Sequence, residues 1–123
     1  WHVPTDEEWK QLEIYLGMSQ AEADATGWRG TDEGGKLKET GTTHWNPPNE
    51  GATNESGFSA LPGGYRNIYG SFNLMGINAY FWSCTESDSN DAWYRFLHYG
   101  NSQVSRKDDF DKRYGLSVRC VRD

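Results

Sequence analysis

The sequence predicts a single α+β domain over residues 1–123, with N-terminal helices followed by a twisted antiparallel sheet and long loops. Signals for helix starts and stops all lie before residue 40, whereas runs of aromatic and β-favouring residues follow residue 57. Helices that precede strands, rather than alternating with them, are typical of α+β domains. A chain of 123 residues can bury one hydrophobic core but not two.

The first predicted helix spans about residues 5–16. Thr5-Asp6-Glu7-Glu8 matches a capping box, in which the Thr5 hydroxyl accepts from the Glu8 amide and the Glu8 side chain reaches back. Trp9, Leu12 and Leu16 then recur at helical spacing, and Gly17 ends the helix.

Two shorter helices and a long loop are expected next. Ser19-Gln20-Ala21-Glu22 repeats the capping signature and starts a helix that ends near Ala25. The segment from Thr31 to Lys38 predicts a further turn or two. Residues 41–57 are mainly Thr, Asn, Pro, Gly and Glu, so we expect a loop, and loops of this length are functional or ordered by packing.

The remaining chain predicts strands. Residues 58–61 lead to a turn at Pro62-Gly63-Gly64, and residues 79–85 and 92–99 form two aromatic strands. In the second, alternation places Trp93, Arg95, Leu97 and Tyr99 on an inward face and Tyr94, Phe96 and His98 on the opposite face. In the final predicted strand, Tyr114, Leu116, Val118 and Cys120 point inward and Gly115, Ser117 and Arg119 point the other way.

Charge and hydropathy exclude several kinds of partner. The net charge is −6 with no basic block, which argues against nucleic acid and against a polybasic membrane patch. No apolar run approaches the roughly 18 residues of a membrane span, so direct membrane insertion is not expected. Because the chain begins at Trp1 without an initiator Met, we expect it to be the C-terminal part of a longer protein.

Neither a metal centre nor a catalytic site is expected. The three histidines have no ligand spacing with cysteine, so no zinc site is predicted. Two acidic stretches, at residues 88–91 and 108–111, leave calcium open, although neither fits a standard calcium loop. Cys84 and Cys120 are read either as a disulfide or as two buried, inert thiols.

A recognition surface is the one functional feature that gains support. The outward face of residues 92–99 and the polar loop expected beyond it interleave aromatic rings with amides and hydroxyls, as binding surfaces do. The alternative, that many of these rings only plate the core, stays open. The predicted ligand-binding residues are Tyr94, Phe96, His98, Tyr99, Asn101, Gln103, Ser105, Lys107, Asp109 and Phe110.

Four segments together resemble a known family. They are the stretch from Trp1 to Trp9, Gly57-Phe58-Ser59-Ala60-Leu61-Pro62-Gly63-Gly64-Tyr65-Arg66, Phe81-Trp82-Ser83-Cys84-Thr85-Glu86 and the final nine residues. In this order they resemble the Fibrobacter succinogenes major paralogous domain, or FISUMP. The family usually carries an upstream strand with a Trp-x-Ala-Glu-Asn-Leu type motif, which this chain lacks.

The resemblance implies a C-type-lectin-like fold with its termini close together, and a distant relation to the formylglycine-generating enzymes. It also implies a link with diversity-generating retroelements, which randomise adenines in C-terminal coding segments. Asn codons altered in this way yield residues such as Tyr, Phe, His, Gly, Ser and Asp. Gln103 and Lys107 fall outside that set. The residues inside it are Tyr94, Phe96, His98, Tyr99, Gly100, Asn101, Ser105, Asp109, Phe110 and Tyr114.

We therefore expect a non-catalytic module of a secreted or cell-surface bacterial protein that binds a protein or glycan through this C-terminal surface, with no cofactor. One alternative is a structural or adhesive domain whose aromatic residues form core. The other is an oxygen-dependent thiol oxidase that uses Cys84 and Cys120. A fold supports many functions, so the site has to decide among these hypotheses.

Overall fold

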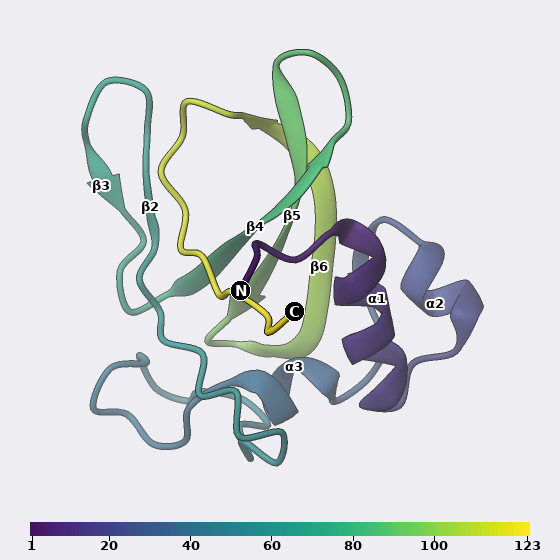
Figure 1. Cartoon of the computed structure of the whole chain (residues 1–123). Helices are drawn as coiled ribbons and strands as arrows, with labels where there is room; N and C mark the ends of the chain where they lie inside the picture. The colour runs from purple at the N-terminus through teal and green to yellow at the C-terminus, as the bar shows by residue number, and fades with distance from the viewer.

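The computed structural model describes all residues, 1–123, and has an α+β architecture (Figure 1). A four-stranded antiparallel sheet in the order β1-β6-β5-β4 forms its centre, and β2 and β3 pair separately as a small hairpin. The helices are α1 (Asp6–Tyr15), α2 (Gln20–Asp24) and α3 (Glu33–Leu37). The strands are β1 (Gly27–Arg29), β2 (Tyr65–Arg66), β3 (Phe72–Asn73), β4 (Asn78–Glu86), β5 (Asp91–His98) and β6 (Asn101–Asp111).

The helices begin where their caps predict. The Thr5 hydroxyl accepts from the Glu8 amide at 3.1 Å and starts α1. Ser19 and Glu22 make a full reciprocal capping box at the start of α2. The third helix also forms, and its Gly34 lies against the backbone carbonyl of Gln103, a position with no room for a Cβ. These local signals act within a few residues, so the sequence alone revealed them.

The sheet confirms two predicted strands and corrects the segment that follows them. β4 and β5 pair as an antiparallel hairpin; β4 extends the predicted run by one residue at each end, and β5 begins and ends one residue earlier than predicted. Residues 101–111, expected as a polar loop, instead form β6, the longest strand. β6 pairs with β5 on one edge and with β1 on the other, so its strand structure comes from neighbours on both sides. The short strands β1, β2 and β3 were not predicted either.

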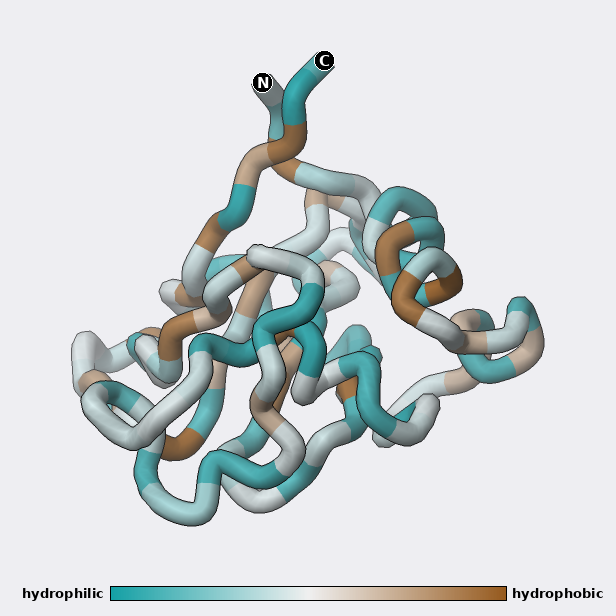
Figure 2. The backbone as a smooth tube through the Cα atoms, turned by 90° about the horizontal axis from the view of Figure 1, so that it is seen from below, coloured by the Kyte–Doolittle hydropathy of each residue, from teal (hydrophilic) through white to brown (hydrophobic).

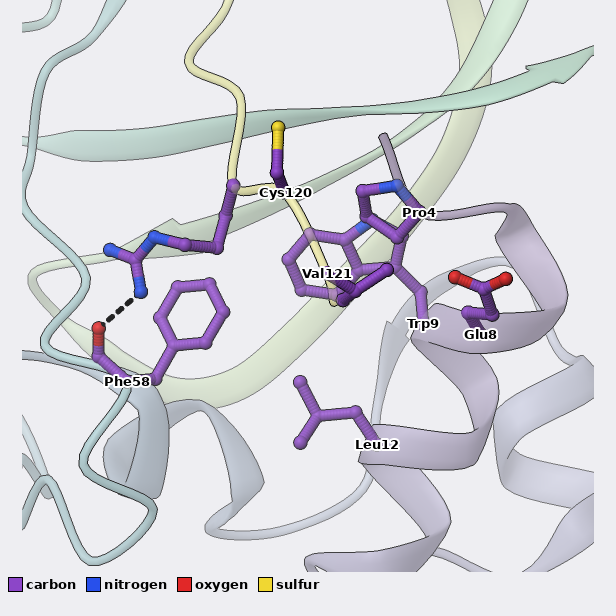
Figure 3. A pocket seen from close by; sticks show the side chains of 8 residues that line it. Pro4, Glu8, Trp9, Leu12, Phe58, Cys120 and Val121 are labelled. Atoms are coloured by element: carbon purple, nitrogen blue, oxygen red, sulfur yellow. Dashed lines mark hydrogen bonds between the residues drawn. The ribbon is translucent and has the colours of Figure 1, made fainter. Parts of the chain in front are cut away.

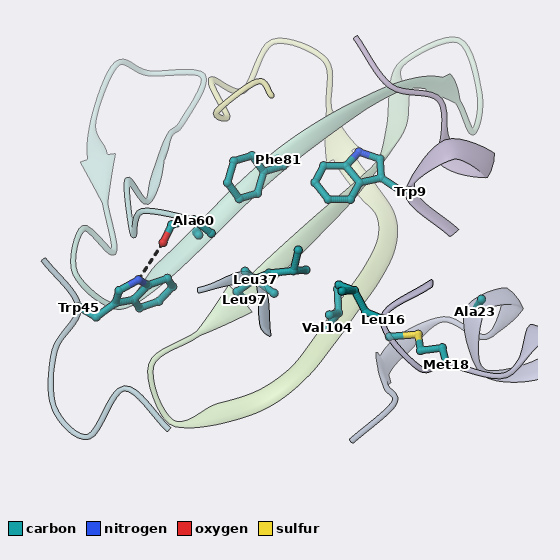
Figure 4. Close-up of a cluster of buried hydrophobic side chains, with 11 residues drawn as sticks. Trp9, Leu16, Met18, Ala23, Leu37, Trp45, Ala60, Phe81, Leu97 and Val104 are labelled. Atoms are coloured by element: carbon teal, nitrogen blue, oxygen red, sulfur yellow. Dashed lines mark hydrogen bonds between the residues drawn. The ribbon is translucent and has the colours of Figure 1, made fainter. Parts of the chain in front are cut away.

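The hydrophobic core fills the space between the helices and one face of the sheet, here called the inner face (Figure 4). Trp9 of α1 packs on Phe81 of β4, with ring centroids 5.8 Å apart. Leu37 of α3 joins Leu97 and Val104 from β5 and β6, and these three side chains are at most 2 % exposed. Each helix contributes at least one side chain to this core, so the inner face is fully covered.

Five charged side chains lie buried beside this core and link α1 to three strands. The Glu13 carboxylate accepts two hydrogen bonds from Arg29, at 2.6 and 3.0 Å, and two from Arg95. The Asp6 carboxylate accepts from Arg95 at 2.7 Å and from Arg106 at 2.8 Å. We call these residues the buried ion network; each is at most 7 % exposed.

Electrostatics sets the protonation state of this network. Burial alone would raise the pKa of Asp6, but hydrogen bonds from Arg106 and the charge of Arg95 outweigh it and lower the pKa. Two of the guanidinium groups that bind these carboxylates also donate to backbone carbonyls: Arg29 to Ala23 and Arg106 to Asp24. Asp6 is therefore ionised at neutral pH, and the network holds α1, the end of α2 and the sheet in one arrangement.

The long loop at residues 41–57 has no helix or strand, as predicted, and is anchored by packing. Trp45 is 1 % exposed, and its indole Nε1 donates to the Ala60 carbonyl at 3.0 Å. Residues 58–61, which follow the loop, form no strand; Ala60 makes one isolated bridge, to Lys38. An ordered loop explains how so polar a segment fits a compact domain.

The final segment does not form the predicted strand. Residues 115, 117 and 121 make isolated bridges to Arg66, Phe81 and His2 in turn. Because the chain passes three different partners, it has no constant inward face: Val118 is 50 % exposed, whereas Arg119 stacks on Phe58. The bridge between His2 and Val121 brings the two ends together, as the resemblance implied (Figure 2).

Replacing Asp6 tests the buried ion network. D6N should lower the free energy of unfolding at pH 7 by about 3–5 kcal/mol, because it leaves two buried guanidinium groups underpaired. The lowered pKa means that the Asp6 contribution is present above about pH 4 and is lost as the pH falls through the pKa of the folded state. D6N should therefore also lose less stability than the wild type between pH 5 and pH 2.

Urea unfolding followed by tryptophan fluorescence measures both effects. The matched control is E7Q on the same helical turn, where the side chain is 71 % exposed. E7Q should stay within about 0.5 kcal/mol of the wild type. An equal loss in both variants would show that the network does not carry the stability assigned to it.

Candidate ligand-binding surface

The face of the sheet opposite the helices carries a continuous group of rings, which we call the aromatic face. Register places Tyr80 beside Phe96, Trp82 beside Tyr94, and Phe96 beside Ser105, which in turn lies beside Trp28. A bulge in β6 brings Phe110 opposite Ala92, so it joins the same face. The aromatic face consists of Trp28, Tyr80, Trp82, Tyr94, Phe96, His98 and Phe110.

These rings stack on one another across four strands. The centroids of Tyr94 and Phe110 are 4.5 Å apart with nearly parallel planes, and those of Tyr80 and Phe96 are 5.2 Å apart. Trp28 meets Phe96 edge-on at 4.8 Å. Ring pairs at these separations add stabilisation beyond the area they bury. The face is thus a rigid platform rather than a set of independent side chains.

Part of this platform is closed from solvent. Tyr65 of the β2–β3 hairpin packs on Tyr80 and Phe110, and Tyr114 stacks on Tyr65 at 5.8 Å. Tyr94 is only 2 % exposed, so the expectation that it is presented outward is wrong. A second, smaller core therefore lies beneath the hairpin. For this part of the face, the alternative that the rings form core is correct.

Tyr94 also has a fixed polar contact. Its hydroxyl donates to the Asp109 carboxylate at 2.6 Å, which ties β5 to β6 at the edge of the small core. Burial, and then the neighbouring Asp109 charge, raise the pKa of Tyr94 far above its usual value. The phenol is therefore neutral and acts as a donor.

The accessible part of the aromatic face lies at its other end. Trp28 is 39 % exposed, and Phe96 and His98 are half-buried beside it. His98 Nδ1 accepts from the Gly100 amide at 3.0 Å, while burial and the Lys38 charge lower its pKa. The imidazole is neutral at pH 7, so its proton is on Nε2.

The structure separates the predicted residues of β6 into accessible and internal ones. Lys107 and Asp109 have side chains 46 % and 61 % exposed and lie 3.8 Å apart. Ser105 is fully buried under its neighbours, so its expected exposure is wrong. Asn101 and Gln103 are half-buried and make internal hydrogen bonds: the Asn101 side chain accepts from the Gln103 amide, and the Gln103 side chain donates to Gly30.

Lys38 fixes the turn between β5 and β6 from below. This fully buried ammonium donates to the carbonyls of Glu50, His98 and Asn101, at 2.8, 3.1 and 3.1 Å. Burial lowers the pKa of Lys38 to about 8. The side chain still carries its charge at pH 7 and joins the long loop to the turn that bears His98, Tyr99 and Asn101.

Sequence reasoning missed three members of the aromatic face: Trp28, Tyr80 and Trp82. A signal for two of them existed, because alternation in β4 puts Tyr80 and Trp82 on one side, and a hairpin aligns that side with Tyr94 and Phe96. Trp28 had no such signal. It reaches the face only because β1 pairs with β6. This pairing places Trp28 beside a residue of β6 that lies more than 70 residues further along the chain.

The cysteines fit neither alternative derived from the sequence. Both are exposed free thiols, so the expected inward orientation of Cys120 is wrong. Cys120 borders a pocket of about 330 Å³ between α1 and the final segment, beside Trp9, Leu12 and Phe58 (Figure 3). Cys84 borders a different hollow, beside Trp82 and Val118.

The acidic stretches come together without forming a metal centre. Asp91 pairs with Asp111 across β5 and β6, and burial together with the nearby Asp88 charge raises the pKa of Asp91. Asp88 instead accepts from two backbone amides of its own turn, at 2.7 and 2.8 Å. The structure contains no group of three or more His, Cys, Asp or Glu side chains arranged to hold a metal ion. It also contains no helix long and apolar enough to cross a membrane.

These features define a small α+β domain with a rigid, partly accessible aromatic platform on a sheet that helices cover from the other side. The chain belongs to the Fibrobacter succinogenes major domain family, whose model matches residues 1–122. No curated protein and no solved structure matches the chain. The family assignment confirms the resemblance seen in the sequence and leaves the function to be argued from the surface.

Substitutions at Tyr94 and Trp28 test which rings are structural. Y94A should lower the free energy of unfolding by about 3–5 kcal/mol, because it empties a buried ring site and removes the hydroxyl bound to Asp109. W28A should cost about 1 kcal/mol, since Trp28 is partly exposed. Thermal or urea unfolding measures both values, and a larger loss for W28A would reverse the assignment.

Replacing Lys38 tests the support of the turn. K38M should leave three buried carbonyls without their donor and lower the free energy of unfolding by about 2–4 kcal/mol. Hydrogen exchange followed by NMR should show faster exchange in residues 98–103, with the α1 amides as internal control. Unchanged protection in the turn would contradict this role.

Proposed function

We propose that the chain is a non-catalytic ligand-binding module of a secreted or cell-surface bacterial protein, and that it recognises a protein or glycan through the accessible end of the aromatic face. The observation that carries the proposal is the platform formed by Trp28, Phe96 and His98, which is rigid and open to solvent although it lies on a well-packed sheet. Preorganised rings bind with little loss of side-chain entropy.

Polar groups surround this platform. The neutral His98 offers Nε2–H as a donor, and Lys107 and Asp109 supply one charge of each sign on the neighbouring strand. A ring platform with a polar rim is the usual anatomy of a recognition surface. The proposal moves the centre of the site from Tyr94 and Phe110 toward Trp28, because the former two rings pack beneath the β2–β3 hairpin.

Sequence diversification fits the same geometry. The accessible side chains of β5 and β6 that face away from the helices, unlike the buried Tyr94 and Ser105, can vary while the buried ion network and inner face keep the fold. A reverse-transcriptase gene and a near-identical template repeat beside the coding gene would establish it. Their absence would remove diversification and leave the binding proposal intact.

A binding experiment tests the proposal directly. The protein is applied to an array of glycans and purified bacterial surface proteins, and the affinity of any hit is measured for the triple variant W28A/H98A/K107A. Loss of these anchors should weaken binding by about 100-fold or more, since hot-spot side chains each contribute about 2 kcal/mol. Y15A, at a tyrosine 86 % exposed on α1, serves as the control.

The structural or adhesive alternative predicts a different result. Under it, the triple variant keeps every interaction while Y94A only destabilises the fold. Unchanged affinity in W28A/H98A/K107A, with near-ultraviolet circular dichroism preserved, would place the contacts elsewhere and overturn the proposed site.

A further inference from the structure

The β2–β3 hairpin exposes a cluster of large apolar side chains that the proposed binding surface does not use. Tyr69 is 87 % exposed, and Phe72 and Met75 are each 74 % exposed. Leu61 and Leu74 are also exposed, at 49 % and 38 %. We call these five residues the hairpin patch. Single exposed apolar residues are common, but five gathered on one projecting element are not.

The patch is continuous in space. The chain before β2 runs beside the chain after β3, since the Gly76 amide donates to the Pro62 carbonyl. Leu61 and Met75 consequently line the same hollow. Phe72 lies across from Arg66 on the face of the hairpin opposite Tyr65, which packs on the aromatic face. The outward side of the hairpin therefore carries the exposed Phe72 beside Arg66, and the hairpin projects at the edge of the molecule (Figure 1).

The polar side chains of the hairpin are turned into it. The Asn67 side chain accepts from the amides of Tyr69 and Ser71, and the Asn73 side chain donates to the Ser71 carbonyl. The patch thus offers rings and aliphatic groups with few free hydrogen-bonding side chains. This chemistry suits an apolar protein surface rather than a sugar.

Charge indicates which protein surface can approach. Arg66 is the single charged residue between Gly57 and Thr85, although the whole chain carries a net charge of −6. Two copies of such an acidic molecule repel each other least when these uncharged segments face each other. Charge therefore leaves this segment as the surface through which two copies of the chain can meet with least repulsion.

The hairpin also has the geometry for self-pairing. β3 has β2 on one side and no strand on the other. An exposed apolar edge strand is a ready template for another strand, and two copies of one edge can pair about a two-fold axis. We infer that the hairpin patch mediates a symmetric dimer of this chain, formed by hairpin-to-hairpin contact.

Sedimentation velocity on the purified chain tests this inference. The wild type should sediment as a dimer at about 100 μM. This high concentration is chosen because a small apolar interface binds weakly. F72E/M75E should raise the dissociation constant at least 30-fold, because it removes two anchors and adds like charges at the interface. F72S/M75S, which adds no charge, should weaken the dimer in the same direction. Both sites are exposed, so circular dichroism should stay unchanged.

Controls separate this surface from the others. Y15E places the same charge at an equally exposed tyrosine on α1 and should leave the dimer intact. Raising NaCl from about 50 to about 500 mM should not dissociate the dimer, since screening weakens repulsion between the acidic copies. A monomeric wild type, a dimer that salt dissociates, or a dimer sensitive to Y15E but not to F72E/M75E would each overturn the inference.

This inference stands apart from the proposed ligand-binding function. W28A/H98A/K107A should dimerise normally, and F72E/M75E should still bind any ligand found on the array. The two proposals can therefore fail separately.

Discussion

The fold depends on the buried ion network that ties the first helix to the sheet. Asp6 and Glu13 lie on the same face of α1, about two turns apart, and between them they bind arginines from β1, β5 and β6. An unpaired charge at such depth would be strongly destabilising, so each member requires the others to be in place. The network fixes the side of the sheet on which the helices pack.

That choice of side determines where recognition can occur. Because the helices cover the inner face, the aromatic rings of β4, β5 and β6 are left on the outer face. The β2–β3 hairpin covers part of these rings through Tyr65, and the end near Trp28 stays open. Lys38 adds a second constraint, since its buried ammonium fixes the turn beside His98.

The same arrangement gives the hairpin two unlike faces. Tyr65 packs inward on Tyr80, whereas Phe72, opposite Arg66, remains in solvent. The proposed ligand recognition on the sheet and the proposed self-association on the hairpin therefore use adjacent but separate surfaces. A dimer built on the hairpins would carry two copies of the aromatic platform, and paired weak sites gain affinity when a ligand can reach both.

The sequence by itself determined the helices, the two strands that correspond to β4 and β5, and the long loop, because caps and alternation act over a few residues. Thr5 with Glu8, and Ser19 with Glu22, identified two helix starts correctly. Only the tertiary structure decided that the polar residues 101–111 form a strand, since their partners β1 and β5 supply the hydrogen bonds. It also decided that Tyr94 is buried and Trp28 exposed, because that depends on which distant segments cover the outer face. The arginines were visible in the sequence, but their carboxylate partners on α1 lie as far as 100 residues away, beyond the reach of any local pattern.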